Sequence, residues 1–112
     1  MYLCFSCSSP LFTYIVSHFI SEKASYIKLS TSAFSGTIKK ITVNTCGGSG
    51  IAATLSITVG STNVMNGQTI TKTNADYSTG EISATGEIVI SWSQTSSKAI
   101  YIKSITIEYT PC

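Results

Sequence analysis

Alternation of apolar and polar residues is the feature that most constrains the fold of this chain. It runs through four segments: Thr37–Thr45, Ala53–Val59, Glu87–Ser93 and Lys98–Tyr109. Successive side chains of a β-strand point to opposite faces, so this alternation creates one buried and one solvated face. A helix with the same pattern would spread its apolar residues around its circumference. The pattern therefore predicts an all-β fold and confines any helix to the N-terminal part.

Two of the alternating segments change phase, which indicates β-bulges. Ile38 is out of phase with the inward positions that follow it, so we expect a bulge near Lys39-Lys40. In the last segment the inward positions change parity after Ile102. This change predicts a bulge or a sheet-switching bend near Lys103-Ser104.

The inward positions of these segments define the expected core. They are Ile41, Val43, Leu55, Ile57, Ile88, Ile90, Trp92, Ile100 and Ile102. Trp92 is expected to anchor the core, because aromatic side chains bury large apolar areas. With a further strand that begins near Ala24, the chain has about six to eight short strands separated by turns, which favours a two-sheet antiparallel β-sandwich.

The segments between these strands carry weaker signals. The glycine-rich run from Cys46 to Gly50 predicts a turn between two neighbouring strands. Gly60–Gly67 also has the composition of a turn, and Gln68–Thr73 is expected to form a short strand that carries Ile70. The polar segment Asn74–Gly80 is expected to be a connection.

The first 23 residues differ from the rest, so we expect an apolar lead at 1–23 and one β-sandwich domain at 24–112. Leu11–Ile20 is too short and too polar to cross a membrane, and no basic start precedes it as in a signal peptide. Phe12–Ile20 has apolar residues at helical spacing, but its β-branched and aromatic residues suit an edge strand equally well. The sequence does not decide between these two structures.

The composition of the chain argues against a nucleic-acid partner. Thirty-five of the 112 residues are Ser or Thr, which suit exposed strand positions. The seven positive charges are all Lys and form no basic run, and the net charge is only +2. A nucleic-acid partner is therefore not expected, because such proteins usually present a basic stripe that includes Arg.

The cysteines and acidic residues suggest no metal site or cofactor. Cys4, Cys7, Cys46 and Cys112 allow three disulfide connectivities, among which the sequence does not choose. The Cys4-x-x-Cys7 spacing lacks the second ligand pair of a zinc site. Oxygen ligands gather at Asn74-Ala75-Asp76, yet a calcium site usually has more carboxylates than Asp76 alone.

No catalytic set is visible, and we expect a protein that is not an enzyme. His18 is the only histidine, so a Ser-His-Asp arrangement would depend on a residue of the uncertain N-terminal segment. The five acidic residues are scattered along the chain and do not nominate a glycosidase pair.

Outward positions of the last segment suggest a binding surface instead. Tyr101 and Lys103 alternate outward from the inward isoleucines, and Tyr77, with Asn74 and Asp76, is expected to add a loop rim. An exposed aromatic group beside a few hydrogen-bonding groups is a common way to hold a sugar. Structural roles are the alternative: Tyr101 covers a cross-strand neighbour, Lys103 is a solvated edge charge and Tyr77 pins its loop.

Four stretches also resemble a known group of domains: Tyr26–Leu29, Gly36–Asn44, Ala53–Gly60 and Lys98–Tyr109. They are similar to the jelly-roll (galactose-binding-like) accessory modules of secreted and surface bacterial proteins, mainly in strand pattern and strand order. The resemblance implies a non-catalytic, extracellular or cell-surface module whose partner is a glycan or another surface protein or domain. A structural spacer or adhesion domain without a small-molecule ligand is the alternative, since fold transfers better than function.

Overall fold

The computed structural model describes residues 12–16, 20–32 and 36–110. These residues form β1 (Phe12–Val16), β2 (Ile20–Lys23), β3 (Tyr26–Thr31), β4 (Thr37–Gly47), β5 (Ala53–Val59), β6 (Thr62–Thr69), β7 (Ala75–Ser78), β8 (Ile88–Gln94) and β9 (Ala99–Thr110). None of the described residues is helical, which confirms the all-β prediction. In the same residues, no helix has the length and hydropathy needed to span a bilayer.

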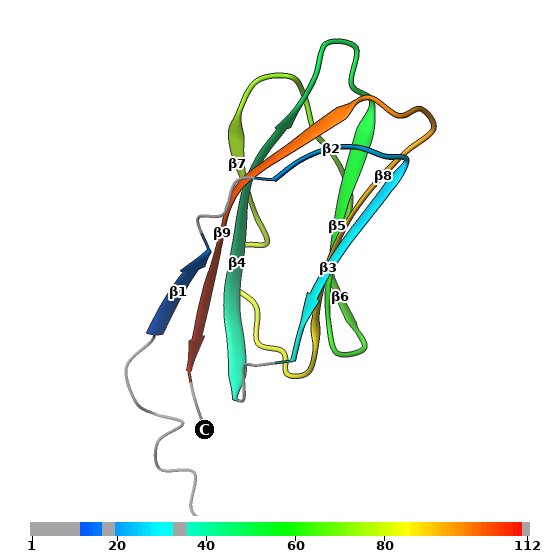
Figure 1. Ribbon diagram of the computed structural model, residues 1–112. Coiled ribbons are helices and arrows are strands. Elements are labelled where there is room, and N and C mark those ends of the chain that lie inside the picture. The colour runs from blue at the N-terminus through cyan, green and yellow to red at the C-terminus, as the bar shows by residue number, and fades with distance from the viewer. Residues whose placement is uncertain (1–11, 17–19, 33–35, 111–112) are drawn as a thin grey trace, which may run out of the picture.

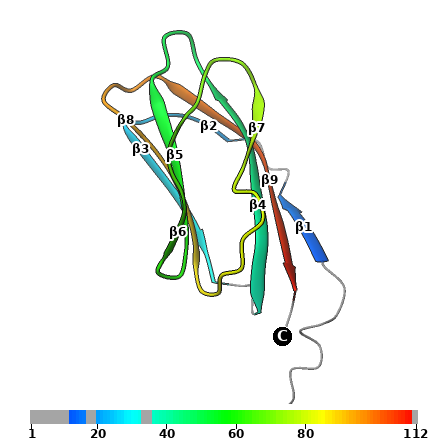
Figure 2. The same cartoon turned by 180° about the vertical axis from the view of Figure 1, so that it is seen from behind.

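The strands form two antiparallel sheets that pack face to face (Figures 1 and 2). Sheet A has the order β1-β9-β4-β7, and β2 also pairs with β9; sheet B has the order β3-β8-β5-β6. From β2 to β9, this strand order is that of a jelly roll. The predicted β-sandwich is thus confirmed, including its jelly-roll arrangement.

The N-terminal strands extend sheet A along one edge of β9. β1 pairs with the C-terminal half of β9, from Val16↔Ile105 to Phe12↔Tyr109, and β2 pairs with its N-terminal half. The sequence leaves a helix and an edge strand as alternatives for Phe12–Ile20, and its described residues Phe12–Val16 form an edge strand. The predicted division at residues 23 and 24 stays a prediction. Cys4, Cys7, His18 and Cys112 lie outside the described residues.

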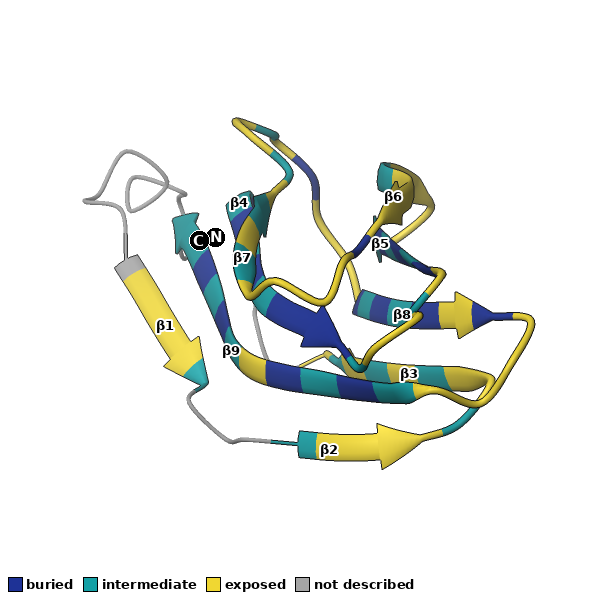
Figure 3. Ribbon diagram, turned by 90° about the horizontal axis from the view of Figure 1, so that it is seen from above, coloured by how far each residue is buried: buried dark blue, intermediate teal, exposed yellow. Residues whose placement is uncertain are grey.

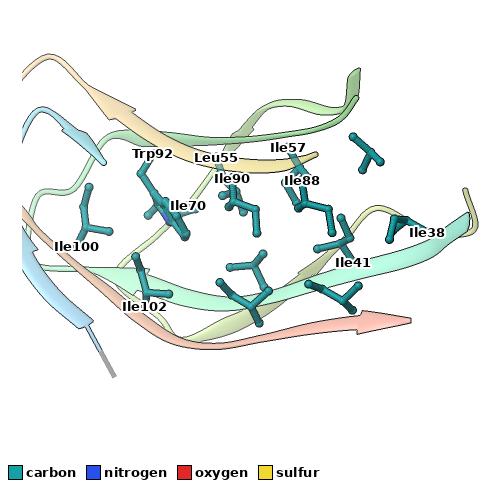
Figure 4. Packing of buried hydrophobic residues seen from close by; sticks show 14 of the residues in the cluster. Ile38, Ile41, Leu55, Ile57, Ile70, Ile88, Ile90, Trp92, Ile100 and Ile102 are labelled. Carbon is teal, nitrogen blue, oxygen red and sulfur yellow. The ribbon is translucent and has the colours of Figure 1, made fainter. Parts of the chain in front are cut away.

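The core lies between the inner faces of the two sheets (Figure 4). All nine predicted core residues are buried, and Trp92 is 0% exposed. Along β9, buried and less buried residues alternate, as Figure 3 shows. Further members of the core are Ile38, Ala53, Val59, Ile70, Ala84, Ile105 and Ile107.

Both predicted bulges occur in the pairing of β4 with β9. The register changes between Ile38 and Lys40, so that Lys39 is an extra residue in β4. It changes again where the partner pairs pass from Asn44↔Ser104 to Thr45↔Ile102, and here Lys103 is the extra residue in β9. Each bulge lets a strand keep its apolar residues inward on both sides of it.

Two segments differ from the prediction. Thr62–Thr69 is an edge strand with two register shifts against β5, rather than a turn. Ile70 is buried, but it directly follows β6 and does not lie in a strand of its own as expected. Its amide donates a hydrogen bond of 3.0 Å to the carbonyl oxygen of Ala53. Ala75–Ser78 is a strand because it pairs with β4, although its polar composition is that of a connection.

Two glycines at one end of sheet B bring two backbone segments into contact. Gly60 directly follows β5 and has φ +62°, and Gly86 lies just before β8 and has φ +123°. A Cβ atom on Gly60 would lie 2.4 Å from the carbonyl oxygen of Thr85, and one on Gly86 would lie 2.6 Å from the Cα of Gly60. Only glycine fits both the backbone conformation and the close approach.

Candidate functional site

The outer face of sheet A carries the candidate site. Tyr101 and Lys103 project from β9 on this face, because Ile100 and Ile102 occupy the inward positions beside them. Asp76 reaches the same face from β7, since it is paired with Asn44, which alternates with the inward Val43. Three of the five predicted residues therefore share one face of one sheet.

Tyr101 is half-buried between two other strands. The register places Ser21 of β2 opposite it on one side and Cys46 of β4 opposite it on the other. Cys46 is only 8% exposed and has a free thiol. Both of these neighbours have small side chains, so Tyr101 is the aromatic residue of the three. Such a ring has an apolar body and a polar hydroxyl group.

A polar row crosses sheet A next to Tyr101. It consists of Ser104, Asn44 and Asp76, which oppose one another on β9, β4 and β7. The side-chain amide of Asn44 donates a hydrogen bond of 2.6 Å to Oδ1 of Asp76. This solvent-exposed bond orients the carboxylate, because a bond to a charged acceptor is among the stronger ones. Asn44 was not among the predicted site residues, although the alternation of its strand already placed it outward.

Tyr77 and Asn74 do not form the expected loop rim. Tyr77 lies in β7 opposite the buried Val43, and its side chain packs against the core from the inner side of sheet A. Asn74 is exposed and directly precedes the strand. The loop interpretation is wrong for Asp76 and Tyr77, because pairing with β4 draws them into the sheet.

A buried hydroxyl group connects this face with the core. Thr45 is 0% exposed on the inner side of β4. Its Oγ1 accepts a hydrogen bond of 3.2 Å from Nε1 of Trp92 in sheet B and donates one of 2.6 Å to the carbonyl oxygen of Tyr101. The backbone of the candidate site is thus joined through Thr45 to the opposite sheet.

The donor set of the candidate site does not fit a calcium ion. The described residues contain no group of three or more His, Cys, Asp or Glu side chains that could hold a metal ion. Asp76 is the carboxylate in the polar row, and one of its oxygens already accepts from Asn44. A protein-held calcium ion takes six to eight oxygen ligands, so we assign no role here to a metal.

No protein-family model matches the sequence, and no curated protein matches it. Among solved structures, the chain is similar to the CBM36-1 domain of a multidomain xylanase from the hindgut metagenome of Trinervitermes trinervoides. The identity is 17% and the TM-score 0.51, over 78% of this chain and 74% of that one.

The chain is also similar to a carbohydrate-binding module CBM36 solved in complex with calcium and xylotriose. The identity is 19% and the TM-score 0.50, over 91% of this chain and 95% of that one. At these identities the similarity concerns the fold alone. The resemblance to jelly-roll accessory modules is therefore confirmed at that level: the chain has the β-sandwich fold of carbohydrate-binding modules.

Proposed function

We propose that the chain is a non-catalytic accessory module that binds a glycan on the outer face of sheet A, through Tyr101, Lys103, Asp76 and Asn44. The observation that carries this proposal is the convergence of these side chains on one face of a fold shared with CBM36 modules. The setting that follows is extracellular or at the cell surface, where such modules serve a neighbouring domain or partner protein.

The chemistry of the face supports an uncharged ligand that carries several hydroxyl groups. Tyr101 offers a ring for stacking against the C–H face of a sugar. The carboxylate of Asp76, oriented by Asn44, accepts hydrogen bonds from sugar hydroxyl groups, and Ser104 both donates and accepts. No paired acid and base face each other across this row, so binding without turnover is the function that we infer.

The test is a titration of the purified chain with xylotriose and with a panel of other oligosaccharides and polysaccharides. We expect saturable binding that weakens about tenfold or more in Tyr101→Ala and in Asp76→Ala. Tyr26→Ala is the matched control, because Tyr26 is 56% exposed on the outer face of sheet B.

The results of this titration distinguish the proposed site, the proposed function and their alternatives. Binding that survives Tyr101→Ala and Asp76→Ala would keep the function but discard the site. A panel without any binding would favour the spacer or adhesion domain. Turnover of a substrate by the isolated chain would overturn the proposal.

A further inference from the structure

We propose that Thr45 is the positioning residue of the candidate site: its hydroxyl group holds the Tyr101 carbonyl and thereby fixes the face on which the Tyr101 ring lies. This inference rests on the proposed function, because it names the residue that gives that glycan site its geometry. Thr45 acts on the backbone of β9, which lies beneath the side chains of the site.

One inserted residue decides on which face Tyr101 lies. Lys103 is the extra residue where the β4–β9 register passes from Asn44↔Ser104 to Thr45↔Ile102. A register change of one residue turns every following side chain to the opposite face. If the parity of the C-terminal half of β9 continued without the bulge, Tyr101 would point into the core and Ile102 to the outer face.

Thr45 is bonded to β9 at the point where the ladder is interrupted. It lies opposite Ile102, and its hydroxyl group donates to the carbonyl of Tyr101 at 2.6 Å. A bulge disrupts the regular hydrogen bonds of its strand. The side chain of Thr45 therefore supplies a hydrogen bond that stabilises the bulged conformation.

Trp92 determines the direction of that hydrogen bond. An indole Nε1 is a donor only, and in this structure it donates to the Thr45 hydroxyl oxygen at 3.2 Å. The single hydroxyl proton is then directed at the Tyr101 carbonyl. Because Thr45 is fully buried, water does not compete for either bond.

The residue type at position 45 supports this role. The inward positions that precede it on β4 hold aliphatic Ile41 and Val43. Burial of a hydroxyl group is costly unless it is hydrogen bonded, so valine would be the simpler residue for packing alone. The two bonds of Thr45 explain why a hydroxyl group replaces a methyl group at this position.

The experiment compares Thr45→Val, which keeps the shape but removes the hydroxyl group, with Thr45→Ser, which keeps the hydroxyl group. Thr58→Val is the matched control, because Thr58 lies half-buried on the outer face of sheet B. Amide hydrogen exchange of residues 101–104 in the ligand-free chain is the first measurement. We expect exchange about tenfold faster in Thr45→Val and nearly unchanged in Thr45→Ser and Thr58→Val.

Two further measurements separate positioning from stability. Xylotriose affinity should fall about fivefold or more in Thr45→Val, should recover in Thr45→Ser and should fall no further when Thr45→Val is added to Tyr101→Ala. Emission of Trp92, the single tryptophan, should change in Thr45→Val, where its Nε1 loses the acceptor.

The outcomes distinguish this inference from the proposed function. Wild-type exchange at residues 101–104 in Thr45→Val would overturn the role of Thr45, whatever the chain binds. Equal effects of Thr45→Val and Thr45→Ser would overturn it as well, because the methyl group would then be the cause. If no glycan binds, the proposed function fails, and the exchange measurement still decides on Thr45. Should Thr45→Val not fold, Trp92→Phe must raise exchange at the same amides, or the inference is wrong.

Discussion

The two sheets differ in where their pairing is irregular and in which residues their outer faces carry. In sheet B, β8 pairs with β3 and β5 without a register shift, and the two shifts of this sheet lie between β5 and the edge strand β6. The outward residues of β3, β8 and β5 are mainly Ser and Thr. In sheet A the central pair β4–β9 contains two bulges, and the outward residues include Tyr101, Lys103 and Asp76. Bulges redirect side chains. On this molecule the aromatic and charged side chains of the candidate site lie close to a bulge in the central pair of sheet A.

The largest effect is expected where the two sheets meet. Trp92→Ala removes the largest fully buried side chain and the donor to Thr45, so it should lower the free energy of unfolding by about 3–5 kcal/mol. Chemical denaturation followed by circular dichroism measures the loss. Trp92→Phe, which keeps most of the volume, should lose clearly less. An unfolding midpoint equal to that of the wild type would show that Trp92 does not support both sheets.

The second effect tests the tight end of sheet B. Gly60→Ala should cost about 2–3 kcal/mol, because it adds a steric clash with Thr85 to the strain of a positive φ. Gly67→Ala is the matched control: its φ is +71°, but no atom lies within 4 Å of an added Cβ. It should lose only about 1 kcal/mol. Equal losses in the two variants would mean that the close approach contributes nothing.

The third effect sharpens the role of the buried hydroxyl group in sheet A. Thr45→Val should lower stability by about 1–3 kcal/mol, because it leaves Trp92 Nε1 buried without its acceptor. Thr58→Val removes a hydroxyl group from sheet B and should stay within about 0.5 kcal/mol of the wild type. Thermal unfolding of both variants measures the difference. If they are equally stable, the hydroxyl group of Thr45 has no special importance.

The smallest effect on stability is expected at the candidate site itself. Tyr101→Ala and Tyr26→Ala should each change the free energy of unfolding by less than about 1 kcal/mol, since both rings lie on outer faces. Thermal unfolding without ligand is the measurement. A much larger loss for Tyr101→Ala would identify Tyr101 as a packing residue that covers its cross-strand neighbours.

The strands with strong alternation could be predicted, together with both bulges of β4 and β9. A strand changes parity within an apolar pattern where one extra residue is inserted, so Ile38 and Ile102 mark the bulges in the sequence. β6 and β7 could not be predicted, because Asn and Gly in Thr62–Thr69 and the polar residues of Ala75–Ser78 favour turns. Their strands exist through pairing with β5 and β4, which local sequence does not encode.

The candidate site was predictable only in part for the same reason. Tyr101 and Lys103 follow from the parity of their own strand. The bond between Asn44 and Asp76 joins residues 32 positions apart, so only the register of β4 with β7 shows it. Thr45 did leave a signal, because a hydroxyl residue shares the inward parity of Ile41 and Val43. Its role depends on the hydrogen bond from Trp92 in the opposite sheet, which the alternation of β4 alone does not reveal.

The position of β9 has a consequence for the order of folding. β9 follows all its partners β1, β2 and β4 in the chain, and it lies between them in the sheet. Before β9 emerges during synthesis, sheet A can contain only the β4–β7 pair, and β1 and β2 have no described neighbour to pair with. Chains dominated by such distant pairings fold on the order of milliseconds to seconds. We expect the nascent chain to acquire its native sheet A late, with the β5–β6 hairpin of sheet B as its earliest ordered part.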